Sequence, residues 1–181
     1  MKLLSSRKVY EGFLTILKLK VETSEGEIVE REVMSRAGGK KSDDAVAALV
    51  FDTDKQKFIF AEQFRSGLMN EDDQSLIEVV AGTLEEGENP EECMIREIEE
   101  EIGYKTDSIE YVGEAFVSPG GTTEKIFLYT VLVSEQISEG GGLADENEEI
   151  EIVEMDVQEV RDYNFRDMKT KLLVTEINNM K

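Results

Sequence analysis

The chain has 181 residues, with 41 acidic and 20 basic side chains, a formal net charge of −21, no histidine and one cysteine. This length suits one domain with a buried core and room for a small appendage. The absence of histidine excludes Ser-His-Asp and Cys-His triads and histidine-ligated zinc, and the negative charge argues against nucleic acid as a partner.

The sequence also restricts location and membrane partners. No apolar run reaches the length of a membrane span and no secretory signal is recognisable, so we expect no membrane partner. Cys93 cannot form an internal disulfide, which fits a cytoplasmic protein. Because no base stands near it in the sequence, we expect Cys93 to be a packing residue of a helix and not a nucleophile.

The first predicted elements are two strand pairs. They are Phe13–Val21 with Ile28–Met34, and Ala45–Phe51 with Lys57–Gln63. The segment Arg36–Asp44 between the two pairs is rich in glycine and charge, which is typical of a boundary. We therefore expect an N-terminal β region at residues 1–40 and a main domain at residues 41–181.

Short strands and C-terminal helices follow. The further predicted strands are Leu76–Val80, Tyr111–Val117, Lys125–Val133 and Ile150–Met155, and the helices are Val157–Asp162 and Met168–Met180. The predicted buried face of the last helix holds Met168, Leu172, Leu173 and Ile177. Strands on both sides of a central helix predict an α+β fold. We expect an α/β/α sandwich, with a mixed sheet flanked by helices and a small N-terminal antiparallel β region.

The most informative segment is the helix predicted within Gly82–Gly103, which reads GTLEEGENPEECMIREIEEEIG. Asn89 can cap the helix, Pro90 suits its first position, and Gly103 suits a left-handed residue just past its end. The apolar positions on one face are Ile95, Ile98 and Ile102. The start, the end and the packing side of this helix are therefore all predicted from local sequence.

A second face of this helix concentrates the glutamates Glu97, Glu100 and Glu101. Four residues rise about 6 Å, and like charges one turn apart destabilise a helix by roughly 0.2–0.5 kcal/mol per pair. Such a cluster needs a cation, and oxygen ligands favour Mg²⁺, with Mn²⁺ as a substitute. The alternative interpretation is a solvated acidic face. The positions of Gly82 and Glu88 upstream favour a metal site over this alternative.

The spacing G-x5-E-x7-R-E-I-x-E-E-x-G resembles the signature box of the Nudix hydrolases, which cleave a nucleoside diphosphate linked to another moiety. The resemblance implies the Nudix fold, with Glu97 and Glu101 binding the metal. Glu100 would ligate the metal or assist catalysis, and Arg96 would organise the carboxylates. The chain departs from the family pattern only at Tyr104, where an aliphatic residue is preferred and the role is structural.

A segment reading GLADENE follows three glycines and resembles the catalytic loop of ADP-ribose pyrophosphatases in this family. The resemblance implies that Glu146 is the general base and Glu148 a metal ligand. The carbonyl oxygen of Ala81 would complete the metal shell. From the residues alone, a mobile acidic loop is the alternative interpretation of this segment, and Glu100 stays an alternative base.

The segment SPGGTTE also resembles these pyrophosphatases, because Pro119 stands sixteen residues after Gly103. The residues that the resemblance assigns to a sugar pocket are Ser118, Pro119, Gly120 and Glu124. A simple turn between two strands is the alternative interpretation.

Arginines near strand ends are the remaining candidates, since positive charge is scarce and arginine binds phosphate oxygens in pairs. Arg65 follows a predicted strand, while Arg31 and Arg36 lie in and after the second N-terminal strand. In the resembled subfamily these positions contact substrate, and a partner subunit contributes an N-terminal segment, which implies a homodimer. Phe13 lies in that segment and could stack on a base. Surface pairing is the alternative for Arg31 and Arg36.

Together these features predict Mg²⁺-dependent hydrolysis of nucleoside diphosphate sugars, with ADP-ribose preferred and cleaved to AMP and ribose 5-phosphate. The connection at residues 69–74 and the glycine-rich acidic loop also fit the GDP-mannose-cleaving branch, which is the alternative substrate class. A non-catalytic nucleotide-sugar-binding Nudix module is the alternative from another class. A sensor could dispense with the carboxylates, and this chain keeps them.

Overall fold

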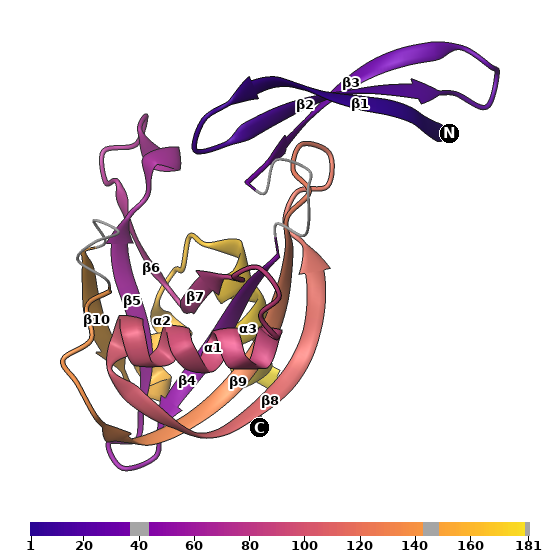
Figure 1. Cartoon of the computed structure of the whole chain (residues 1–181). Coiled ribbons are helices and arrows are strands. Elements are labelled where there is room, and N and C mark those ends of the chain that lie inside the picture. The colour runs from indigo at the N-terminus through magenta and orange to yellow at the C-terminus, as the bar shows by residue number, and fades with distance from the viewer. Residues whose placement is uncertain (37–43, 143–148, 180–181) are drawn as a thin grey trace. The chain divides into compact units, whose positions relative to one another are not determined.

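The computed structural model describes residues 1–36, 44–142 and 149–179 (Figure 1). Contacts divide the chain into two units, which are described separately. Unit 1 comprises Met1–Ala45 and Glu114–Ile126, and unit 2 comprises Val46–Gly113 and Phe127–Lys181. The boundary expected at residue 40 stays a prediction.

Unit 1 contains a three-stranded antiparallel sheet of order β1-β2-β3. Its strands are β1 (Lys2–Glu11), β2 (Thr15–Glu22) and β3 (Ile28–Ser35). The predicted pair corresponds to β2 and β3, whereas β1 was not predicted. Every residue of β1 is exposed, so its sequence lacks the alternation that marks a half-buried strand. Backbone pairing with β2 defines it instead.

Unit 2 is built on a seven-stranded sheet, along which β10-β5-β4-β9-β8 are neighbours while β6 pairs with β5 and β7 with β4. The strands are β4 (Ala45–Asp52), β5 (Lys57–Phe64), β6 (Ser75–Glu78), β7 (Val80–Thr83), β8 (Tyr104–Phe116), β9 (Lys125–Gln136) and β10 (Ile150–Met155). The strand predicted at Leu76–Val80 is in fact two strands separated at Val79. β8 begins at Tyr104 rather than Tyr111, and as the outer strand it needs no apolar alternation.

Helices flank the sheet on two sides. They are α1 (Pro90–Glu97), a π-helical turn at Ile98–Ile102, α2 (Val157–Asp162) and α3 (Met168–Asn179), with a short 3-10 turn at Ser66–Leu68. Figure 1 shows α1 in front of the sheet and α2 and α3 behind it. The predicted α+β sandwich with a mixed sheet is confirmed. Within the described residues, no helix has the length and apolarity to span a membrane.

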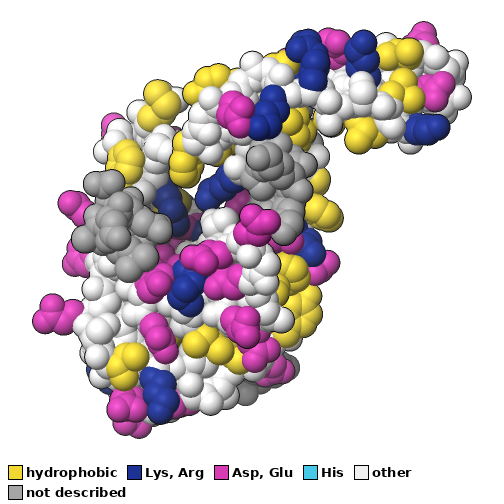
Figure 2. Space-filling model, in the orientation of Figure 1, with side chains coloured by type: hydrophobic (Ala, Val, Ile, Leu, Met, Phe, Trp, Pro, Cys, Tyr) yellow, Lys and Arg dark blue, Asp and Glu magenta, His cyan; other side chains and the backbone are white. Residues whose placement is uncertain are grey.

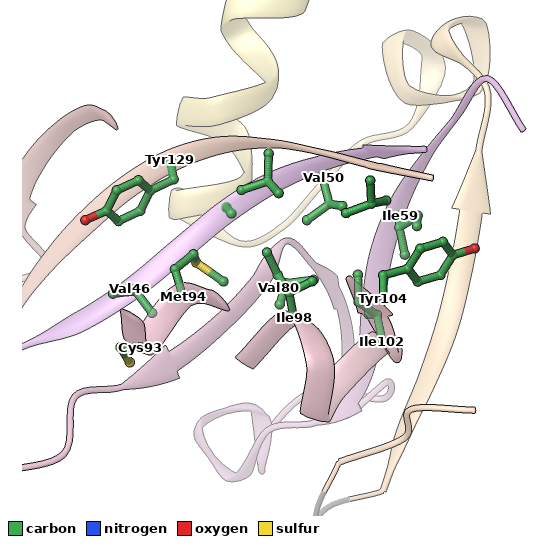
Figure 3. Close-up of a cluster of buried hydrophobic side chains, with 13 residues drawn as sticks. Val46, Val50, Ile59, Val80, Cys93, Met94, Ile98, Ile102, Tyr104 and Tyr129 are labelled. Carbon is green, nitrogen blue, oxygen red and sulfur yellow. The ribbon is translucent and has the colours of Figure 1, made fainter. Parts of the chain in front are cut away.

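Two of the three predicted apolar positions of the box helix, Ile98 and Ile102, are buried in the core between α1 and the sheet, whereas Ile95 is half-buried and Met94 is buried in the core. Met94, Ile98 and Ile102 are fully buried against Val46 and Val80 of the strands (Figure 3). Burying each large apolar side chain contributes about 1.5–3 kcal/mol, so this face fixes the helix on the sheet. Of the acidic residues on the same helix, Glu97 and Glu100 are half-buried, whereas Glu101 is buried.

The predicted buried face of α3 is only partly correct. Leu173 and Ile177 are buried, whereas Met168 and Leu172 are 60% and 51% exposed. Thr170 is fully buried and takes the place expected for an apolar residue. It lies three and seven residues before Leu173 and Ile177, so these side chains share one helix face. Because the side chain of Thr170 is polar, a search for apolar periodicity does not detect this buried face.

Candidate metal and active site

Arg96 contacts three carboxylates of the box. Its Nε and Nη2 donate to the two oxygens of Glu88 at 2.9 and 3.1 Å. Its Nη1 donates to Glu97 Oε1 and to Glu100 Oε2, each at 2.8 Å. One guanidinium thus links the loop before α1 to the acidic face of the helix, and acidic side chains gather on the face that carries α1 (Figure 2).

This contact changes the electrostatics of the box. The hydrogen bonds from Arg96 lower the pKa of Glu88 to about 2, more than offsetting the effect of burial. The Glu88 hydrogen bond is in turn the main cause that raises the pKa of Arg96. Cys93 lies buried beneath this pair, and burial raises the pKa of its thiol. Cys93 is therefore a packing residue, as expected.

The strand before the box brings Ala81 and Gly82 against the helix. A Cβ on Gly82 would lie 1.9 Å from Cδ of Glu97, so a larger residue at this position would displace that carboxylate. The backbone N–H of Ala81 donates to Glu101 Oε2 at 3.2 Å, and Glu101 is only 3% exposed. Three of the predicted metal ligands, Ala81, Glu97 and Glu101, are thus brought to the same place.

These donors suit a hard divalent cation, because they are carboxylate oxygens and a main-chain carbonyl. Within the described residues, however, no three Asp, Glu, Cys or His side chains already converge as a metal site. The contacts give the reason: Arg96 holds Glu97 and Glu100, while Glu101 accepts a bond from Ala81. The residues fit the metal by their chemistry, and a bound cation would compete with Arg96 for Glu97.

A glycine segment caps the end of the box helix. Gly103 has φ 73°, as predicted for a left-handed residue at a helix end. The N–H of Gly141 donates to the carbonyl of Glu101 at 2.8 Å, and that of Gly142 donates to the carbonyl of Glu100 at 3.2 Å. The last carbonyls of the helix are therefore satisfied by a segment distant in sequence.

The predicted general base and the fourth metal ligand, Glu146 and Glu148, lie outside the described residues, so their roles stay predictions. The described chain resumes at residue 149, and the N–H of Ile150 donates to the carbonyl of Gly141 at 3.4 Å. Gly141 therefore contacts both the end of the box helix and the first residue of β10.

In unit 1, the turn after β8 lies against β3. The predicted pocket residues of this turn are Ser118, Pro119, Gly120 and Glu124. The carbonyl of Ser118 accepts the N–H groups of Gly121 and Thr122, both at 2.9 Å, which makes a tight turn. Met34 of β3 donates to the Gly121 carbonyl at 2.8 Å and accepts from the N–H of Thr123 at 3.2 Å. The structure thus brings this turn to the strand that carries Arg31.

Three other predicted substrate residues lie on the surface of unit 1. Nη1 of Arg31 donates to the carbonyl of Glu30 at 3.1 Å. Arg36 follows β3 and is exposed. Phe13 lies between β1 and β2 and is 86% exposed. The roles of these three residues in substrate binding stay predictions.

Arg65 has a partner that the sequence did not predict. Its Nε donates to Oε1 of Glu78 at 2.6 Å, and Glu78 is 2% exposed in the sheet. Glu78 also bonds to Lys169 of α3. A single glutamate within the apolar run Leu76–Val80 was the available signal, because a charge in a buried strand requires a partner.

The fold and the box together identify the class of protein to which this chain belongs. A family model for the NUDIX domain matches residues 41–173. The chain therefore belongs to the Nudix hydrolase family, which confirms the resemblance drawn from the box. Nudix pyrophosphatases generally depend on a divalent metal.

Known proteins similar to this chain include pyrophosphatases. A GDP-mannose pyrophosphatase of Cronobacter sakazakii is 37% identical over 163 residues, covering 84% of this chain and 81% of that protein. An ADP-ribose pyrophosphatase of Haemophilus influenzae is 30% identical over 161 residues, covering 83% and 71%. A methanol dehydrogenase activator of Bacillus methanolicus is 30% identical over 178 residues, covering 96% and 90%.

A solved structure supports the fold. The crystal structure of an ADP compounds hydrolase superposes with a TM-score of 0.79, covering 99% of this chain and 94% of that chain. Its sequence identity is 17%, so this likeness concerns the fold alone.

Proposed function

We propose that this protein hydrolyses the diphosphate bond of nucleoside diphosphate sugars with the help of Mg²⁺. The observation that carries the proposal is the arrangement of the box, in which Arg96 links Glu88, Glu97 and Glu100. Beside it, Glu101 is buried against Ala81. Similarity to proteins named GDP-mannose pyrophosphatase and ADP-ribose pyrophosphatase supports this reaction class.

The residues that would hold the metal are the Ala81 carbonyl, Glu97, Glu101 and Glu148. When bound, Mg²⁺ would supply a positive charge that stabilises the charge developing on the diphosphate oxygens. Glu97 needs the space above Gly82 to reach the site. Arg96 would hold Glu97 and Glu100 in place despite their mutual repulsion.

The group that takes a proton from the attacking water would be Glu146. The alternative, Glu100, accepts a hydrogen bond from Arg96 at 2.8 Å, which commits one of its oxygens to a cation. We propose Glu146 because its segment resembles the catalytic loop of ADP-ribose pyrophosphatases, and Glu100 stays the alternative base.

Two substrates are candidates. The SPGG turn with Pro119 favours ADP-ribose, and a 30% identical relative is an ADP-ribose pyrophosphatase. The connection at residues 69–74 and the 37% identical relative favour GDP-mannose. We also propose that Phe13, Arg31, Arg36 and the turn residues contact the nucleotide sugar, in a cytoplasmic homodimer.

A substrate panel tests the reaction class. Purified protein with Mg²⁺ would be given ADP-ribose, ADP-glucose, GDP-mannose, UDP-glucose and diadenosine polyphosphates, and the products would be identified. Release of a nucleoside monophosphate and a sugar phosphate supports the proposal. Binding without turnover of any compound would instead identify a non-catalytic binding module.

Two glutamate variants test the assigned roles. Glu101→Gln should lower turnover by about a hundredfold or more, because a metal ligand is lost while the amide oxygen still accepts from Ala81. Glu146→Gln should lower kcat far more than it raises KM. Glu99→Gln, an exposed neighbour, is the control. Full activity of Glu101→Gln would remove the metal site proposed here.

A further inference from the structure

A buried charged network joins β6 to α3 in unit 2. Glu78 is 2% exposed and accepts from Nε of Arg65 at 2.6 Å and from its Nη2 at 3.3 Å. Nζ of Lys169 also bonds to Oε2 of Glu78. The carboxylate is thus held between two cations, one from the end of β5 and one from α3.

A second set of contacts fastens α3 in this position. Nζ of Lys169 lies 3.1 Å from Oδ1 of Asp167. The hydroxyl of the fully buried Thr170 donates to Oδ2 of Asp167 at 2.7 Å and accepts from the N–H of Val79 at 3.0 Å. Since Val79 adjoins Glu78, the first turn of α3 is tied to the same point of the sheet that holds the carboxylate.

Stability alone is a poor reason for such a network. Replacing a buried ion pair by apolar residues of similar volume is often neutral or stabilising, because desolvation offsets the Coulomb attraction. The Arg65 side chain is also not enclosed, since 39% of it is exposed. Among the residues that the structure describes, Nη1 of Arg65 donates to no partner. The network therefore fixes the orientation of the Arg65 guanidinium while leaving it partly exposed to solvent.

The network lies next to the proposed metal site, because Glu78 stands three residues before Ala81, whose N–H donates to Glu101 Oε2 at 3.2 Å. Burial lowers the pKa of Arg65, but the carboxylates of Glu78, Glu101 and Asp167 more than offset it and the pKa lies above its usual value. Glu101 is among the ligands proposed for the metal. An anion that meets the metal at Glu101 would therefore also meet the positive charge of Arg65.

We infer that Glu78 and Lys169 are positioning residues that hold the Arg65 guanidinium with its free edge available to a diphosphate oxygen. Glu78 binds one edge of the guanidinium, and Lys169 keeps the Glu78 carboxylate from turning away. This inference rests on the proposed hydrolysis of nucleoside diphosphates. It assigns α3 a part in substrate binding that none of the box residues supplies.

Kinetics in two backgrounds test the inference. Lys169→Met should raise KM by about tenfold with little change in kcat, because a loosened Arg65 binds the diphosphate less well. In the Arg65→Gln background, the same substitution should have no further effect. An equal effect in both backgrounds would overturn the inference, since Lys169 would then act independently of Arg65.

Two further variants separate positioning from folding. Lys171→Met changes an exposed lysine of the same helix and should leave KM unchanged. Lys169→Arg keeps the positive charge beside Glu78 and should retain most of the wild-type KM. A KM increase of the same size in Lys171→Met would show a general effect on α3 and would contradict the inference.

A spectroscopic measurement makes the test independent of activity. The Nε–H signal of Arg65 in a ¹H–¹⁵N spectrum can be assigned by its loss in Arg65→Lys. Its proton should exchange slowly with solvent, because the Nε–H donates to Glu78. Lys169→Met should broaden or remove it, whereas Lys171→Met should not. An unchanged signal in Lys169→Met would overturn the inference. If the wild type hydrolyses nothing in the panel, only the proposed function fails and this signal still decides the positioning.

Discussion

At the scale of single residues, the arrangement of the box depends on the guanidinium of Arg96 and on the absence of a side chain at Gly82. Arg96 pairs with Glu88, Glu97 and Glu100, and Gly82 leaves the space that Glu97 occupies. The resemblance implied that Arg96 would organise the carboxylates, but it was not predicted that Glu88 would be its partner or that Gly82 would lie against Glu97. Nor was Glu78 predicted as a partner of Arg65, since nothing local to either residue specifies the other.

The pairing of Glu88 with Arg96 predicts a pH dependence of stability. Arg96 lowers the pKa of Glu88 from 4.5 to about 2, so the unfolded chain takes up this proton at higher pH than the folded chain. The stabilising contribution is therefore complete above about pH 5 and is lost as pH falls towards about 2. Thermal unfolding midpoints of wild type and Glu88→Gln, measured with EDTA, should differ at neutral pH and converge in acid.

Glu92→Gln, which alters an exposed glutamate of α1, is the matched control for this experiment. Its unfolding midpoint should stay near that of the wild type across the same range. A difference between wild type and Glu88→Gln that is constant with pH would contradict the assigned cause.

At the scale of elements, the box helix has the predicted ends but not the predicted interior. Asn89, Pro90 and Gly103 mark the start and the end through local chemistry. Between Ile98 and Ile102 the helix is a π-helical turn in which Glu101 is buried together with both isoleucines. Helical periodicity could not predict this turn, because burial against the sheet and the bond to Ala81 act on it.

The cap of α1 gives a prediction for the element. The side chain of Asn89 accepts the N–H of Glu91 at 2.9 Å. Asn89→Ala should lower the free energy of unfolding by about 0.5–2 kcal/mol, whereas Asn89→Asp should retain it, because a carboxylate also caps a helix. Urea denaturation of both variants checks this. Equal destabilisation by the two substitutions would show that the cap bond is not the cause.

At the scale of the whole molecule, the N-terminal sheet is rich in exposed apolar side chains. Leu3, Tyr10 and Ile28 are 58%, 61% and 64% exposed. A sheet that exposes several large apolar side chains is a candidate interaction site. It supports the proposed homodimer through residues 1–40, in which the partner would be a second copy of the chain.

Light scattering after size exclusion tests this assembly. The wild type should elute at twice the chain mass of 20.4 kDa. The double variant Leu3→Glu, Tyr10→Glu should elute as a monomer, because dimerisation would bury two negative charges that have no partner in the interface. Leu172→Glu, which adds a charge at an exposed position of α3, should remain a dimer. A monomeric wild type would remove the dimer proposal.

Local spacing was enough to predict the family, the metal-ligand candidates, the ends of the box helix and most strands, because each depends on residues close together in the chain. The burial of Thr170, the pairing of Glu78 with both Arg65 and Lys169, and the capping of the box helix by Gly141 could not be predicted in this way. They join segments far apart in the chain. Such contacts form only when the sheet and its two helical layers bring those segments together, so they are set by packing and not by local pattern.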